Sequence, residues 1–129
     1  MINKAKIKLS LIDDYVKISV IINFLNCSLN DECGQPNCTQ LLQNTQDIGN
    51  KLKSAYEFLF EKLNLNNTSF MVLKQQLLCN NAFLTLQQKN AESLPVVLEK
   101  MYGDLQQITS NLKPKLEKLK LNVGPEIFC

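Results

Sequence analysis

The sequence of 129 residues contains no arginine, no histidine and no tryptophan, and only four glycines and four prolines. Without histidine, the chain cannot form a Cys-His or Ser-His catalytic pair or a mixed cysteine–histidine zinc site. Without arginine it lacks the side chain that reads phosphate and guanine in bidentate fashion, and aromatic residues are few, so we expect no nucleic-acid partner. The glycines are isolated, which excludes a glycine-rich phosphate loop. We therefore expect a protein that is not an enzyme, with no catalytic residues, no metal site and no cofactor.

Leucine, lysine, glutamine, asparagine and glutamate dominate the sequence, and together with the scarcity of glycine and proline they favour helices. The formal net charge is +2, and both signs are spread along the chain, which is typical of solvated helix faces. Helical periodicity is clear in residues 38–63 and 93–121 and less regular in residues 69–88. The composition and the periodicity together predict an all-α fold.

The apolar positions of residues 38–63 recur at steps of three and four, which predicts a helix that begins near Pro36-Asn37. They are Leu41, Thr45, Ile48, Leu52, Ala55, Tyr56, Leu59 and Leu63. Phe58 breaks the pattern, because at 100° per residue it falls on the polar side of the helix, near Lys51 and Lys62. It is either a singly exposed aromatic or an anchor for a partner, since interface centres favour aromatics. Phe58, Lys51 and Lys62 are thus the candidate partner contacts.

The stretch of residues 93–121 predicts a second long helix, with Ser93 as its cap and Pro95 in its first turn. Its apolar stripe consists of Leu98, Met101, Leu105, Ile108, Leu112, Leu116 and Leu119. Pro114 lies inside the stripe and removes one backbone hydrogen bond. Because the stripe keeps its phase beyond Pro114, we expect either one kinked helix or two abutting helices.

The first 27 residues have the outline of a secretory signal peptide, with a basic start followed by the mostly apolar stretch YVKISVIINFL. Asp13 and Asp14 interrupt that outline, and no Ala-x-Ala-like cleavage site follows. The segment is too short and too charged to span a bilayer, so we expect no membrane insertion. Residues 1–27 are therefore either a signal peptide or an N-terminal extension, and residues 28–129 are the helical bundle domain.

The five cysteines leave an even number, four, if a signal peptide ends after Cys27. The disulfide candidates are then Cys33, Cys38, Cys79 and Cys129, and their pairing stays open. Their spacing lacks the paired C-x2-C of a zinc site and the C-x-x-C of a thioredoxin-like dithiol. The remaining alternatives are disulfides in a secreted domain and reduced thiols in a cytosolic bundle.

Three Asn-x-Ser/Thr sequons fall in the non-periodic stretches. Their asparagines are Asn37, Asn66 and Asn67, which are the glycosylation candidates. They favour an extracellular location, although an asparagine-rich chain also produces such matches by chance.

Two segments resemble helical cytokines of the interleukin-6/leukaemia inhibitory factor/ciliary neurotrophic factor group. CTQLLQNTQDIGNKLKSAYEFLFEKLNL resembles the first helix of that group, and LPVVLEKMYGDLQQITSNLKPKLEKL resembles a later one. PKLEKLKLNV, which begins in the second segment and ends at Val123, is similar to a segment of granulocyte colony-stimulating factor, and MYGDL is similar to the interleukin-12 alpha subunit. The resemblance implies an up-up-down-down four-helix bundle, either complete or truncated to three long helices.

The resemblance also implies a function, that of a secreted signalling ligand that binds and bridges cell-surface cytokine receptor chains, alone or with a second subunit. The alternative is a non-secreted helical-bundle interaction or adaptor protein without catalytic activity. The fourth long helix of the group has no evident counterpart, unless residues 10–26 supply it.

Overall fold

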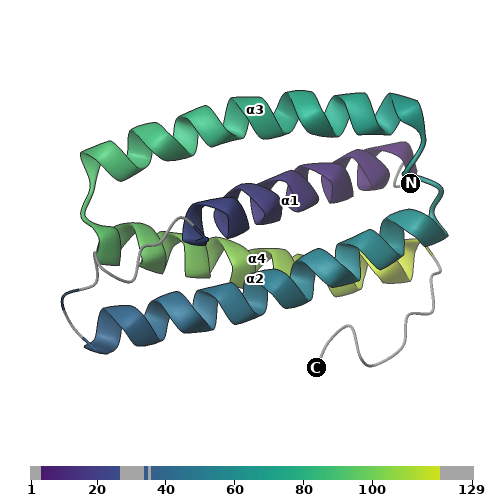
Figure 1. Cartoon of the computed structure of the whole chain (residues 1–129). Helices are drawn as coiled ribbons and strands as arrows, with labels where there is room; N and C mark the ends of the chain where they lie inside the picture. Colours follow the sequence, from purple (N-terminus) through teal and green to yellow (C-terminus); the bar gives the residue numbers. More distant parts are fainter. Residues whose placement is uncertain (1–3, 27–33, 35, 120–129) are drawn as a thin grey trace.

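The computed structural model describes residues 4–26, 34 and 36–119, and these residues form four long helices (Figure 1). The helices are α1 (Lys4–Leu25), α2 (Pro36–Lys62), α3 (Thr68–Ala91) and α4 (Leu94–Lys118). No strand occurs within the described residues. The prediction of an all-α four-helix bundle is confirmed, and the truncated three-helix alternative is wrong because α1 supplies the fourth helix.

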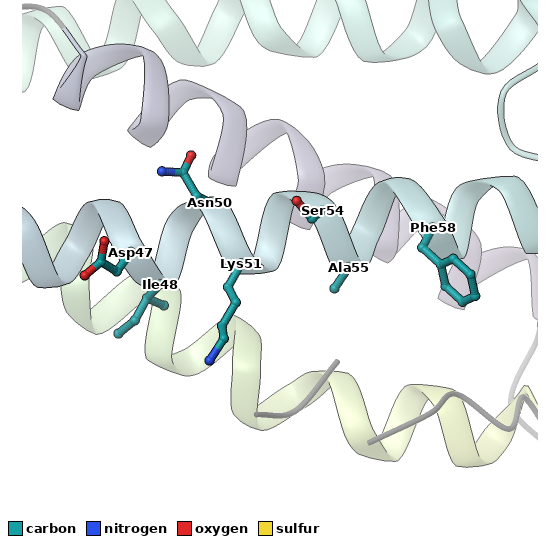
Figure 2. Close-up of a pocket in the computed structure, with 7 residues that line it drawn as sticks. All are labelled: Asp47, Ile48, Asn50, Lys51, Ser54, Ala55 and Phe58. Atoms are coloured by element: carbon teal, nitrogen blue, oxygen red, sulfur yellow. The ribbon is translucent and has the colours of Figure 1, made fainter. Parts of the chain in front are cut away.

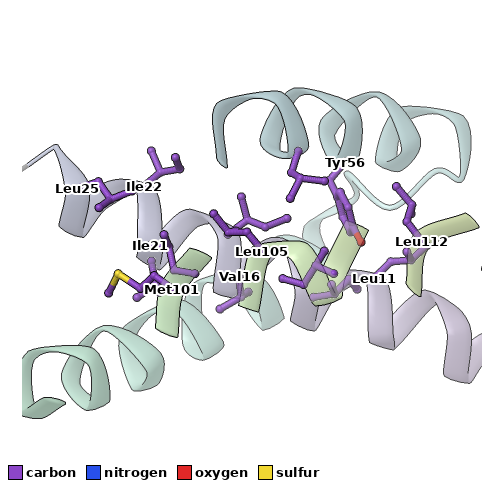
Figure 3. Close-up of a cluster of buried hydrophobic side chains, with 14 of the residues drawn as sticks. Leu11, Val16, Ile21, Ile22, Leu25, Tyr56, Met101, Leu105 and Leu112 are labelled. Carbon is purple, nitrogen blue, oxygen red and sulfur yellow. The ribbon is translucent and has the colours of Figure 1, made fainter. Parts of the chain in front are cut away.

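The first helix, α1, lies at the centre of the bundle and is buried on most of its circumference. Its buried apolar residues are Ile7, Leu11, Ile12, Val16, Ile18, Val20, Ile21, Ile22 and Leu25. Figure 3 shows several of them against Tyr56 of α2 and against Met101, Leu105 and Leu112 of α4. β-branched residues have modest helix propensity, so tertiary packing rather than local preference stabilises this helix.

Successive helices run in opposite directions. The amide of Gln46 donates a hydrogen bond to the carbonyl oxygen of Leu25 at 3.1 Å, whereas the hydroxyl of Tyr56 donates to Asp14 at 3.0 Å. Late α1 residues therefore meet early α2 residues, and Figure 1 shows the same alternation for α3 and α4. This order differs from the predicted up-up-down-down order. The links at residues 63–67 and 92–93 are short, and short links place successive helices antiparallel.

The third helix, α3, forms an outer layer that lies mainly along α1 (Figure 1). None of its described side chains is buried, and Phe70, Leu73, Leu77 and Leu78 are half-buried against the core. The irregular pattern of residues 69–88 nevertheless forms one continuous helix. The tightly packed core thus belongs to α1, α2 and α4.

The second helix, α2, ends in a Schellman motif built on asparagine. Asn64 has a positive φ of 62°, and the N–H of Leu65 donates to the carbonyl oxygen of Phe60 at 2.8 Å. The N–H of Asn64 donates to Glu61 at 3.3 Å, and the side chain of Leu65 is buried. Asparagine tolerates the left-handed conformation better than most residues, so Asn64 takes the position that glycine usually fills.

The fourth helix, α4, continues through Pro114 without a break. Leu112 and Leu116 are both buried, which confirms that the stripe keeps its phase across the proline. Pro114 itself is exposed. None of the helices, over the described residues, combines the length and apolar character needed to cross a membrane.

Candidate functional site

The candidate site is the outer face of α2, where the predicted contact residues lie together. Lys51, Ser54, Phe58 and Lys62 are separated by three or four positions, so they share one side of the helix, and all are exposed. The core-facing side of α2 carries Leu52, Tyr56 and Leu59, which are buried. The helix therefore turns a continuous polar face to solvent with one large aromatic in it.

Phe58 is the feature of this face that burial does not explain. Its side chain is 44% exposed, as its place on the polar side of the helix predicts. The ammonium group of Lys62 lies 5.4 Å from the centroid of the Phe58 ring, within the range of a cation–π contact. This contact covers one part of the ring and holds the Lys62 charge beside it.

A pocket of about 660 Å³ runs along the same face. Its described lining consists of Asp47, Ile48, Asn50, Lys51, Ser54, Ala55 and Phe58. Figure 2 shows Ile48, Lys51, Ala55 and Phe58 on one side of α2, with Asn50 pointing the other way. Apolar groups of Ile48 and Ala55 beside the Phe58 ring and Lys51 offer contact area for a protein chain.

The described residues offer no grouping for metal chemistry. No cluster of three or more histidine, cysteine, aspartate or glutamate side chains that could hold a metal ion occurs among them. The pocket on α2 contains one carboxylate, Asp47, and one amine, Lys51, on successive turns of an exposed helix surface. The surface is suited to binding through shape and charge.

The cysteines divide between two outcomes. Cys38 is buried in the first turns of α2 and is disulfide-bonded. Cys79 is a free and exposed thiol on α3, so the prediction that it forms a disulfide differs from the structure. Its side chain faces solvent, where the amide of Gln75 donates to its sulfur at 3.9 Å. Cys33 and Cys129 lie outside the described residues.

The three sequon asparagines are exposed, but they have different surroundings. Asn37 lies in the first turn of α2, and Asn66 and Asn67 lie in the link before α3. The side-chain oxygen of Asn67 accepts a hydrogen bond from the N–H of Phe70 at 3.1 Å, so Asn67 caps α3. The side-chain oxygen of Asn66 accepts one from Lys74 at 3.4 Å.

A polar cluster inside the bundle is not predicted by any motif in the sequence. The carboxylate of Asp14 on α1 accepts hydrogen bonds from Tyr56 of α2 at 3.0 Å and from Lys115 of α4 at 2.8 Å. Lys115 also donates to the hydroxyl of Ser10 at 2.6 Å. Burial and the Asp14 carboxylate raise the pKa of the Tyr56 phenol far above its usual value of 10.0. The cluster joins three helices and fixes their register.

The role of Asp14 in joining the helices is not evident from the sequence pattern. In the linear sequence, Asp13 and Asp14 look like interruptions of an apolar segment. In the structure Asp13 is exposed, and Asp14 turns inward to the partners on α2 and α4. The only signal in the sequence is one charged residue on the apolar side of a helix, which identifies neither partner.

Comparison of the chain with protein-family models, with curated proteins and with solved structures finds no match in any of the three.

Proposed function

We propose that this chain is a non-catalytic interaction or adaptor protein whose partner binds the outer face of α2, with Phe58 at the centre of the contact. The proposal rests on the exposure of Phe58, a residue that is 44% accessible on an otherwise polar helix face. Aromatic side chains are enriched at the energetic centres of interfaces, where a polar rim surrounds them. The rim on α2 consists of Asp47, Lys51, Ser54 and Lys62.

The partner surface follows from the chemistry of this face. The Phe58 ring would fit an apolar recess on the partner, and Ile48 and Ala55 extend the apolar contact along the pocket. Lys51 and Lys62 flank the ring and call for carboxylates on the partner. We expect a folded protein partner with an apolar recess that is bordered by acidic side chains.

The experiment is photo-crosslinking from α2 followed by measurement of affinity. A benzophenone amino acid at position 58 should capture a protein that the same group at Val96 does not capture. Val96 is 50% exposed on α4 and supplies the matched control. With the purified partner, Phe58→Ala should raise the Kd by more than about tenfold and Val96→Ala by less than about twofold.

Phe58→Ala should also leave the free energy of unfolding within about 0.5 kcal/mol of the unmodified protein, because the ring is a surface group. A larger loss of stability would mean that Phe58 stabilises the fold and is not mainly a binding residue. An unchanged Kd for Phe58→Ala, with the partner bound elsewhere on the chain, would remove α2 as the contact surface.

A secreted cytokine-like ligand that bridges cell-surface receptor chains is the second candidate. This candidate would use the same α2 surface as the adaptor protein, but it would act outside the cell. Two observations favour it: Cys38 is disulfide-bonded, as in oxidising compartments, and Asn37, Asn66 and Asn67 are exposed. The alternating helix directions speak against the up-up-down-down topology that the resemblance implies.

Mass measurement of the protein made in a secreting cell distinguishes the two candidates. Export predicts loss of mass on glycosidase treatment and a Cys38 thiol that alkylates only after reduction. The N-terminal peptide shows at the same time whether residues 1–27 are retained. A protein that stays in the cell, carries no sugar and has an alkylatable Cys38 would leave only the adaptor candidate.

A further inference from the structure

The ammonium group of Lys74, on α3, lies over two aromatic rings that belong to other helices. Its nitrogen is 4.9 Å from the ring centroid of Phe60 on α2 and 5.7 Å from that of Tyr15 on α1. The two rings are themselves in contact, with centroids 5.0 Å apart and planes inclined at 60°. A cation within about 6 Å of a ring face is attracted by the ring quadrupole, and here two rings act on one cation.

Polar groups complete the surroundings of this cation. The hydroxyl of Tyr15 donates a hydrogen bond to the carboxylate of Glu57 at 3.1 Å, and Lys74 donates to the side-chain oxygen of Asn66 at 3.4 Å. Burial lowers the pKa of the Lys74 amine from its usual 10.5, while the Glu57 charge acts in the opposite direction. The site therefore combines aromatic faces, partial desolvation and a nearby negative charge, as sites for organic cations do.

The site lies where the core meets α3. None of its described side chains is buried, whereas Phe60 is 1% exposed in the core. A second pocket, of about 290 Å³, lies between α1, α2 and the first half of α3. Tyr15, Lys53, Met71, Lys74 and Leu78 are among the residues that line it. The aromatic contact of Lys74 thus lies at the open edge where α3 meets the core.

We propose that the Tyr15–Phe60 ring pair is a binding site for an alkylammonium group, that the chain fills it with its own Lys74, and that this occupancy holds the first half of α3 against α1 and α2. The ligand class is a primary amine on an alkyl chain. The Lys74 side chain is the ligand supplied in cis, and a free alkylamine can replace it when that side chain is shortened.

Hydrogen exchange of the α3 amides tests the attachment. Lys74→Met keeps the alkyl chain and removes the charge, so exchange in residues 70–80 should accelerate about five- to tenfold. Lys74→Arg keeps a cation over the rings and should exchange within about twofold of the unmodified protein. Lys53→Met removes a charge from the same pocket and should also leave exchange in α3 unchanged.

Chemical rescue tests the binding site itself. In Lys74→Ala, added n-butylammonium should slow the exchange of residues 70–80 back toward the unmodified rate. Equal concentrations of n-butanol or sodium chloride should not, because the first lacks the charge and the second lacks the alkyl chain. If butanol slowed the exchange as much as the amine, the site would bind any apolar group, and the proposal of an alkylammonium site would be wrong. A Lys74→Met protein with unmodified exchange, or no rescue by the amine, would overturn the proposal.

Discussion

At the scale of residues, the hydroxyl group of Tyr56 makes the stability of the folded protein depend on pH in the alkaline range. The Tyr56 hydroxyl donates to Asp14 from a fully buried ring. Tyr56→Phe removes that bond and leaves Asp14 with Lys115, so we expect a loss of about 1–2 kcal/mol in the free energy of unfolding at pH 8. Tyr102→Phe, at a half-exposed position on α4, should change it by less than about 0.5 kcal/mol.

The difference in unfolding free energy between the unmodified protein and Tyr56→Phe should decrease as the pH rises above 10. The folded-state pKa of Tyr56 lies above the unfolded value of about 10, so its contribution to stability is complete below pH 10. Above pH 10 the unfolded chain loses the phenol proton while the folded chain keeps it, and the contribution falls by up to about 1.4 kcal/mol per pH unit. Urea unfolding from pH 8 to 11.5 should therefore show the unmodified protein and Tyr56→Phe converging. Parallel profiles would contradict this assignment.

At the scale of helices, one glycine sets how closely α2 approaches α1. A Cβ atom added at Gly49 would collide with the δ-methyl of Ile22, and the next Ile22 carbon is 3.1 Å away. Gly49→Ala gains about 1 kcal/mol of helix propensity and costs about 1–3 kcal/mol in overpacking, so we expect a net loss of stability.

Gly103 on α4 provides the matched control, because nothing lies within 4 Å of an added Cβ there. Gly103→Ala should stabilise the protein by about 0.5–1 kcal/mol. Thermal or urea unfolding of the two variants should thus give shifts of opposite sign. Stabilisation by both would mean that Ile22 moves aside at little cost.

The helices differ in how well the sequence predicts them, and burial explains the difference. The stripes of α2 and α4 are clear because one side of each helix faces solvent, and the exposure of Phe58 follows from the same periodicity. Most of the surface of α1 is buried in the core, so its sequence is apolar except for a narrow polar strip. Such a sequence resembles a signal peptide. The partners of Asp14 and the aromatic site of Lys74 depend on the packing of three helices, which no local pattern encodes.

At the scale of the molecule, we expect residues 1–27 to be essential for folding of the bundle. They contain α1, whose buried side chains contact the other helices of the core. We expect a variant without residues 1–27 to lose cooperative unfolding and most of its helical circular dichroism signal. A synthetic peptide of residues 4–26 should restore both in a concentration-dependent manner. Cooperative unfolding of the truncated chain at an unchanged midpoint would show that α2, α3 and α4 suffice.

The central position of α1 has a consequence for biosynthesis. Of the four helices, α1 leaves the ribosome before the others, and α4, which completes its enclosure, leaves after them. At roughly 5–20 residues per second, the segment from Leu25 to Lys118 takes on the order of 5–20 s to translate. For that interval the most apolar helix of the protein has no complete set of partners. Chains that stall or terminate before α4 should therefore bind chaperones and aggregate, whereas chains that include α4 can bury α1.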